Sequence, residues 1–178
     1  MIKNLRKSNG EFTSDEKEMD EMTIDFFRNL YTSEHTRNMQ AVLDSLRVKA
    51  SVEMNEGLMA PFIEKEVKEA LFLMFPTKAP GPDGFPAHFF QRHWDLCGKE
   101  ITSVVLRVLS GEDDPATIND TFIVLIPKVA SPEELGQFRP ISLCNVIFKI
   151  VSKVVANRLK VVLLEIISEE QSAFVLAG

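Results

Sequence analysis

The sequence predicts a predominantly helical α+β fold, and three observations support this prediction. Several segments carry apolar residues at helical spacing. One short segment is rich in β-branched and aromatic residues, as strands are. Apolar residues make up 45% of the 178-residue chain, enough for one sizeable core or two small ones.

The first predicted helix runs from about Ser14 to Tyr31. Its start is indicated by a capping box, in which the Thr13 hydroxyl and the Glu16 carboxylate satisfy backbone N–H groups of the first turn. Apolar residues then recur at helical spacing, at Met19, Met22, Phe26 and Leu30. The chain from Thr32 to Glu56 is less regular, and a short helix is expected around Met39–Leu46.

Three further helices and a strand are predicted downstream. A run of β-branched and aromatic residues, Thr121–Ile126, is halted by Pro127 and predicts the strand. A polar loop, Ala130–Gln137, leads from this strand to Phe138–Ser142. Apolar periodicity predicts the helices at Glu64–Met74, Ala87–Leu109 and Leu143–Leu164.

A segment rich in proline and glycine, Pro76–Pro86, separates two of these helices. Neither a helix nor a sheet tolerates so many turn residues, so a rigid, extended turn is predicted there. The turn has two interpretations from its spacing alone. It is either purely structural, or it presents Lys78 and Asp83 to a partner.

Charge is distributed unevenly along the chain, which carries a net charge of −6. Glu11–Asp25 contains seven acids and one lysine, a local charge of −6, so the remainder is balanced overall. Gln137–Lys160 contains no acid and five cations, namely Arg139, Lys149, Lys153, Arg158 and Lys160. This basic segment is interpreted either as a solvated helix face or as a surface that binds an anionic partner.

Several function classes are excluded by the residue pattern. Cys97 and Cys144 are far apart and belong to no metal-binding motif, so neither a disulfide framework nor a metal site is expected. The apolar runs are too short for a membrane span, and no secretory signal follows the basic N-terminus. No nucleophile motif accompanies the three histidines, and the Pro/Gly segment lacks the Gly-Lys-Ser/Thr of a P-loop. We therefore expect an intracellular protein without a membrane partner.

Five blocks of the sequence resemble one family in order and in spacing. The five blocks are Lys78–Phe85, Ile123–Lys128, Phe138–Asn145, Lys149–Leu159 and Ile167–Val175. They resemble the reverse transcriptases of non-LTR (long interspersed) retrotransposons, most like those of the plant type. Phe26–Tyr31 also looks like the segment that joins the endonuclease and polymerase regions of such proteins.

The resemblance implies a fold and a division of the chain. Residues 1–75 are expected to form a helical N-terminal extension or linker, and residues 76–178 the fingers region of a right-hand polymerase, without its palm. The intact protein is expected to be an RNA-directed DNA polymerase that binds an RNA template, a DNA primer and deoxynucleoside triphosphates. Its location is expected to be the nucleus or the cytoplasm, and no oligomeric state is predicted.

The resemblance also implies roles for individual residues. Lys128 and Arg139 are expected to contact the incoming nucleotide, since a point charge and a two-pronged donor suit a polyphosphate. Lys149, Lys153, Arg158 and Gln171 are expected on the nucleic-acid side. Lys78, Gly81, Asp83 and Gly84 are expected to form a structural turn or a template grip.

No catalytic residue is expected within this chain. Polymerases of this kind hold two Mg²⁺ ions with palm aspartates, in a hairpin where an aromatic residue and a spacer precede two aspartates. Asp113-Asp114 is the sole Asp-Asp pair in the sequence, and Pro115 after it argues for a loop that ends a helix. We expect the Mg²⁺ ligands to lie beyond Gly178 in a longer parent, and the chain itself to be inactive. The alternatives are a non-catalytic nucleic-acid-binding module and an inactive retroelement relic.

Overall fold

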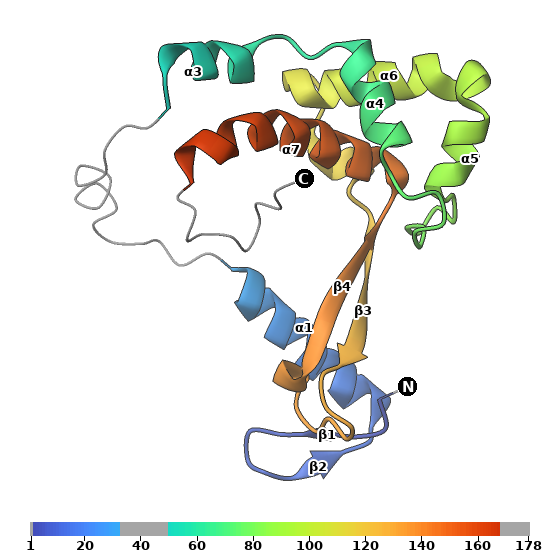
Figure 1. Ribbon diagram of the computed structural model, residues 1–178. Helices are drawn as coiled ribbons and strands as arrows, with labels where there is room; N and C mark the ends of the chain where they lie inside the picture. The colour runs from blue at the N-terminus through green and yellow to red at the C-terminus, as the bar shows by residue number, and fades with distance from the viewer. Residues whose placement is uncertain (1, 33–49, 168–178) are drawn as a thin grey trace. The chain divides into compact units, whose positions relative to one another are not determined.

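The computed structural model describes residues 2–32 and 50–167 (Figure 1). These residues form helices and two small two-stranded sheets, which confirms the prediction of a predominantly helical α+β fold. No helix among them is long and apolar enough to cross a membrane. The short helix expected around Met39–Leu46 lies outside the described residues.

The chain divides into two compact units. The first unit comprises Met1–Leu46 and Ile123–Ile141, and the second comprises Arg47–Phe122 and Ser142–Gly178. This division follows the packing of the chain, and the expected functional boundary near residue 75 stays a prediction.

The first unit begins with a small antiparallel sheet that the sequence did not predict. Strands β1 (Leu5–Arg6) and β2 (Phe12–Thr13) pair with Leu5 opposite Thr13. Strands of two residues are too short to show an alternating pattern. Helix α1 (Glu16–Tyr31) follows directly.

Helix α1 starts with a different cap from the one predicted. The Asp15 side chain is the N-cap and accepts a hydrogen bond from the Glu18 N–H at 3.0 Å. The Thr13 hydroxyl instead accepts from the Asp15 N–H at 3.2 Å, because Thr13 still belongs to β2. The Thr13–Glu16 capping box was therefore wrong, although the helix itself is confirmed.

A small apolar cluster holds the first unit together. Strands β3 (Thr121–Pro127) and β4 (Phe138–Cys144) form the second sheet, and a short 3₁₀ helix, η2 (Leu135–Gln137), precedes β4. Leu5, Leu135 and Phe138 are buried together. Met19, Met22 and Phe26 of α1 pack against them, on the stripe that helical spacing predicted.

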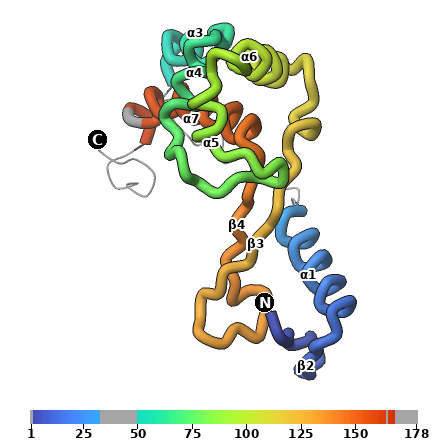
Figure 2. Tube along the Cα trace, turned by 90° about the vertical axis from the view of Figure 1, so that its right-hand side faces the viewer, coloured from blue at the N-terminus to red at the C-terminus, as the bar shows by residue number. Residues whose placement is uncertain are grey.

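The second unit is a group of helices around a larger core. In it, α4 packs on both α6 and α7 (Figure 2). The helices are α3 (Val52–Met59), α4 (Glu64–Phe72), α5 (Ala87–Arg92), α6 (Trp94–Ser110), the 3₁₀ helix η1 (Pro115–Ile118) and α7 (Val146–Ile166). The core consists of Val67, Ala70, Leu71, Ala87, Phe90, Ile101, Val105, Val146, Ile150 and Val154.

Two helices of this unit differ from the prediction. The single helix expected over Ala87–Leu109 is broken at His93, whose backbone (φ −107°, ψ 23°) lies outside the helical region. The break allows Phe90 of α5 and Val105 of α6 to reach one core. Helix α3 was not predicted, and it begins after Ser51, whose side chain accepts from the Met54 N–H.

Candidate nucleic-acid and nucleotide contacts

The Pro/Gly segment is fixed against the start of α7. A Cβ atom on Gly81 would lie 2.3 Å from the Asn145 backbone nitrogen, so only glycine allows this close approach. The Asn145 side-chain oxygen accepts a hydrogen bond from the Asp83 N–H at 3.2 Å. Gly84 has a φ of 75°, in the left-handed region that favours glycine. The turn thus has a defined conformation and a defined docking site.

Lys78 and Asp83, the two charged residues of the turn, are both exposed. Their charged groups differ in whether they form hydrogen bonds with the described residues. The Asp83 carboxylate accepts a hydrogen bond from the Phe85 N–H at 3.1 Å and so stabilises the turn itself. The Lys78 ammonium has no polar partner among residues 2–32 and 50–167. Of the two residues that the sequence singled out here, Lys78 is therefore the one available to an anion.

Lys149 and Lys153 lie one turn apart on α7. The Lys149 ammonium donates a hydrogen bond to the Ala79 carbonyl at 2.8 Å, which ties α7 to the Pro/Gly turn. Lys153 is partly exposed, and its ammonium has no hydrogen-bond or ion-pair partner within the described part of the chain. The structure thus brings Lys149, Lys153 and the turn together in one region of the second unit.

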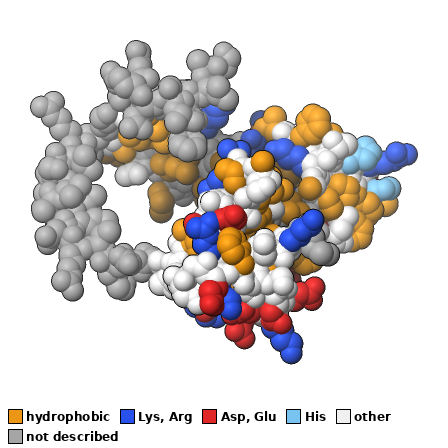
Figure 3. Space-filling view, turned by 90° about the horizontal axis from the view of Figure 1, so that it is seen from below, with side chains coloured by type: hydrophobic (Ala, Val, Ile, Leu, Met, Phe, Trp, Pro, Cys, Tyr) orange, Lys and Arg blue, Asp and Glu red, His pale blue; other side chains and the backbone are white. Residues whose placement is uncertain are grey.

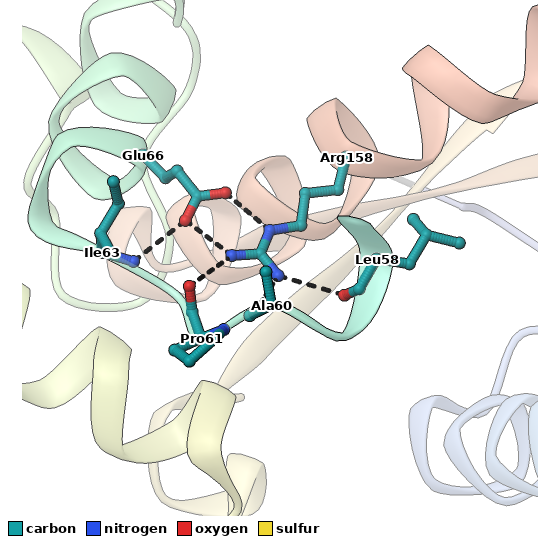
Figure 4. A network of polar contacts seen from close by, with 6 residues as sticks. All are labelled: Leu58, Ala60, Pro61, Ile63, Glu66 and Arg158. Atoms are coloured by element: carbon teal, nitrogen blue, oxygen red, sulfur yellow. Dashed lines mark hydrogen bonds and ion pairs between the residues drawn. The ribbon is translucent and has the colours of Figure 1, made fainter. Parts of the chain in front are cut away.

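Arg158, which the resemblance assigned to the nucleic-acid side, is engaged inside the second unit (Figure 4). Its guanidinium binds the Glu66 carboxylate with two hydrogen bonds, from Nε at 2.6 Å and from Nη2 at 2.8 Å. It also donates to the carbonyls of Leu58, Ala60 and Pro61. The guanidinium carbon lies 3.7 Å from the centre of the Phe62 ring.

We call these contacts the Arg158–Glu66 network. In it, Arg158 holds α7 against α4 and against the segment that precedes α4. Glu66 also accepts a hydrogen bond from the Ile63 N–H at 2.9 Å. The Arg158 hydrogen bonds are the main cause that holds the pKa of the Glu66 carboxyl below its ordinary value. Since its donors are committed within the chain, we leave Arg158 out of the nucleic-acid contact proposed below.

The position of Arg158 in the sequence contains a signal for this role. Arg158 follows the fully buried Val154 by four residues, so both lie on the same side of α7. Lys153 lies directly before Val154 and therefore points elsewhere. Charge alone grouped Arg158 with the lysines, whereas helical spacing separates it from them.

The two residues expected to contact a nucleotide, Lys128 and Arg139, belong to the first unit. Lys128 directly follows β3, and its N–H donates to the Gln137 carbonyl at 2.8 Å. Arg139 is the second residue after Gln137 and lies near the start of β4, so this hydrogen bond joins the segments that carry the two cations. The Lys128 ammonium donates to the Gly136 carbonyl at 2.8 Å, while the exposed Arg139 guanidinium has no polar partner in the described ranges.

The remaining sequence predictions concern acids and the C-terminal segment. Asp113 binds Arg107 at 2.6 Å, and Asp114 caps η1 by accepting from the Ala116 N–H at 2.8 Å, which confirms a loop after α6. In the described residues, no three His, Cys, Asp or Glu side chains lie close enough to hold a metal ion. Gln171 lies outside those residues.

Comparison with known proteins identifies a transposon relative. The chain is 32% identical over 149 residues to a protein of Xenopus laevis described as the transposon TX1 uncharacterized 149 kDa protein. The match covers 83% of this chain but 11% of that protein, so the chain spans about a tenth of its relative's length. No model of a known protein family matches the chain. The chain is thus related, distantly, to a transposon protein.

Proposed function

We propose that this chain is the N-terminal extension and fingers region of a non-LTR retrotransposon reverse transcriptase of the plant type. The observation that carries this proposal is the similarity to a transposon protein over 83% of the chain. The five sequence blocks between Lys78 and Val175 give the finer assignment. In this role the chain holds template and incoming nucleotide for a polymerase whose chemistry takes place elsewhere.

The proposed template contact lies on the second unit. The Lys153 ammonium has no polar partner within the described ranges, and Lys149 uses one of its three donors on the Ala79 carbonyl. Lysines of this kind bind the phosphates of any sequence, because a phosphate contact positions nucleic acid without reading bases. Lys78 of the neighbouring turn supplies a further cation.

The proposed nucleotide contact lies on the first unit. Arg139 offers a planar set of donors that matches the oxygens of a phosphate, and Lys128 offers a point charge. Besides its bond to the Gly136 carbonyl, Lys128 has two ammonium donors that bind no other described residue. A triphosphate with several anionic oxygens would use both cations.

Magnesium ions would act in the parent polymerase by neutralising the reacting phosphate oxygens. The described residues contain no cluster of three candidate ligands, so they do not fit such a centre. We therefore assign the Mg²⁺ ligands to the palm of the parent and derive no catalytic step within this chain.

The template contact is tested by the salt dependence of RNA binding. We expect the 178-residue chain to bind a short oligouridylate, with an affinity that falls as salt rises, because bound phosphates release counterions. Lys153→Gln should weaken binding and lower the magnitude of the log–log slope by about 0.7. Lys65→Gln is the matched control, because the Lys65 side chain is 77% exposed on α4 and lies outside the proposed contact. Equal slopes for the two variants would contradict the assignment of Lys153, and no binding at low salt would contradict the proposed function.

The nucleotide contact is tested separately. In the parent polymerase, Arg139→Ala should raise the KM for deoxynucleoside triphosphates strongly while template affinity stays unchanged. The expectation follows from the loss of a two-pronged phosphate donor. Unchanged steady-state nucleotide kinetics would remove Arg139 from the proposed contact.

A non-catalytic nucleic-acid-binding module is the second candidate function. It is favoured by Lys78 and Lys153, because their ammonium groups have no polar partner among the described residues and can bind phosphates without a catalytic centre. It uses the same lysines and predicts the same salt dependence. Sequencing the transcript beyond the Gly178 codon separates the two, because an aspartate-bearing palm in frame supports the polymerase and a stop codon supports the module or an inactive relic.

A further inference from the structure

Three aromatic side chains form a continuous row along α5. Phe85, Phe89 and His93 are spaced by four residues, so they lie on one side of this helix and its flanks. The ring centroids of Phe85 and Phe89 are 4.7 Å apart, and those of Phe89 and His93 are 5.0 Å apart. We call these three residues the aromatic row.

The aromatic row is supported from below but is not covered. Phe90, which is buried, contacts Phe89 edge-to-face at 5.3 Å and Phe85 at 6.1 Å. Phe85 and Phe89 nevertheless remain 45% and 38% exposed. Neighbouring exposed aromatic rings are typical of interaction sites, because leaving apolar surface in water costs free energy that binding a partner recovers.

Both cations and acids lie around the aromatic row. Helix α5 itself contains no acidic residue, and its exposed side chains His88 and Arg92 are joined by Lys78 of the preceding turn. Their side chains make no ion pair within the described part of the chain. The nearby Asp83 carboxylate faces the Phe85 N–H, and Asp95 follows in the first turn of α6. Figure 3 shows orange apolar side chains gathered beside pale blue histidines and blue cationic side chains.

We propose that the aromatic row stacks on unpaired bases of single-stranded nucleic acid. Such a strand combines flat aromatic faces with a row of anions, and therefore matches both exposed rings and unpaired cations. A purely apolar protein surface would bury the rings but would leave the cations without counter-charges. This proposal rests on the proposed function and adds to it a contact for bases beside the contact for phosphates.

The position of the aromatic row agrees with the proposed phosphate contact. Phe85 directly follows the Pro/Gly turn, which is docked on Asn145 and bound through Ala79 by Lys149. The turn thereby connects the rings to the cations of α7.

The test compares a short single-stranded RNA with the same strand made abasic at its central positions. Both carry the same phosphates, so the difference in their affinities reports base contacts alone. We expect the full chain to bind the intact strand about tenfold more tightly than the abasic strand. Phe89→Leu, which keeps an apolar side chain but removes the ring, should weaken intact-strand binding about tenfold and leave abasic-strand binding unchanged.

Two further variants control for folding and for general hydrophobicity. Phe89→Trp retains an aromatic face and should bind the intact strand as well as the natural chain does. Leu96→Ala removes an apolar side chain that is 80% exposed on α6 and should leave both affinities unchanged. Circular dichroism melting of each variant shows whether the chain as a whole still folds.

The outcomes separate this proposal from the proposed function. If intact and abasic strands bind the natural chain equally, the base-stacking proposal is overturned while the phosphate contact stands. If neither strand binds at low salt, both are overturned. If Phe89→Leu does not fold, the base-stacking proposal is decided by the affinities of the natural chain and of Phe89→Trp for the intact and the abasic strand. Equal binding of the intact strand by Phe89→Leu and the natural chain would also overturn the base-stacking proposal.

Discussion

The Arg158–Glu66 network and the aromatic row lie in the same unit, but they differ in how fully other residues of the chain engage their side chains. Arg158 is a cation in a segment without acids, yet its guanidinium is committed to Glu66 and three carbonyl groups. Phe85 and Phe89 are apolar, yet they stay substantially exposed.

The difference shows that partners, and not residue type, decide which side chains are available for binding. A guanidinium with all its directions occupied has nothing left for a phosphate, whereas a ring with one open face can still bind a base. Lys153 and Arg158 make the same point on one helix, since they are five residues apart and, within residues 2–32 and 50–167, only the Arg158 side chain has polar partners.

The largest expected effect comes from removing the arginine of the network. Arg158→Ala should lower the free energy of unfolding by about 3 kcal/mol, because it leaves the Glu66 carboxylate without its counter-charge and frees three carbonyls. Urea denaturation measures this loss. Arg158→Lys should recover part of it, since lysine keeps the charge but not the two-pronged geometry. A loss below about 1 kcal/mol, or a fall in RNA affinity of fully folded Arg158→Ala, would break the comparison.

The second-largest loss of stability is expected from substitutions in the Pro/Gly turn, which directly precedes the aromatic row. Gly81→Ala should cost about 2 kcal/mol, because the new Cβ would overlap the Asn145 backbone, 2.3 Å away, and displace the turn. Gly84→Ala is the matched variant, with open space around the Cβ but a φ of 75°. It should cost about 1 kcal/mol, for backbone strain alone. Equal losses in thermal or urea unfolding would contradict the close docking of Gly81 on α7.

A smaller effect is expected from pH. The folded pKa of Glu66 lies below its unfolded value, chiefly because of the Arg158 hydrogen bonds. Its contribution to stability is therefore fully present above the unfolded pKa and is lost as pH falls through the folded pKa. Urea unfolding of the natural chain and of Glu66→Gln, measured from neutral to acidic pH, should show a stability difference that shrinks in this range. A difference independent of pH would show that the charge of Glu66 contributes nothing.

The smallest effect is expected at the exposed ion pair of α4. Lys65 and Glu69 are 3.7 Å apart, and their side chains are 77% and 56% exposed. Lys65→Gln should change the free energy of unfolding by no more than about 0.5 kcal/mol, since water and salt screen such pairs. A larger loss would mean that the exposed Lys65–Glu69 pair stabilises the fold nearly as much as the enclosed Arg158–Glu66 pair, against the comparison made here.

Much of the fold was predictable because local patterns specify it. The stripe of Met19, Met22 and Phe26 predicted α1, and the run that ends at Pro127 predicted β3. The caps were less predictable, because Thr13 and Asp15 are both residue types that cap helices and the pairing of Thr13 in β2 is not visible in the sequence. The break at His93 was not predictable, since nothing in the local sequence stops the helix there and only the packing of Phe90 and Val105 on one core requires it.

The candidate contacts divide in the same way. The cations at positions 128, 139, 149 and 153 were identified from sequence and stay predictions. The engagement of Arg158 was overlooked because its partners lie about 100 residues away in the chain. The aromatic row was overlooked because phenylalanines at helical spacing usually indicate a core.

By itself, the sequence determined the helical segments, the strand before Pro127, the rigid turn and the uneven charge, since each depends on neighbours along the chain. Only the tertiary structure decided that Arg158 binds Glu66, that Gly81 lies against Asn145 and that Phe85 and Phe89 stay exposed. Burial and partnership depend on residues brought together by folding, and the linear pattern does not contain those distances.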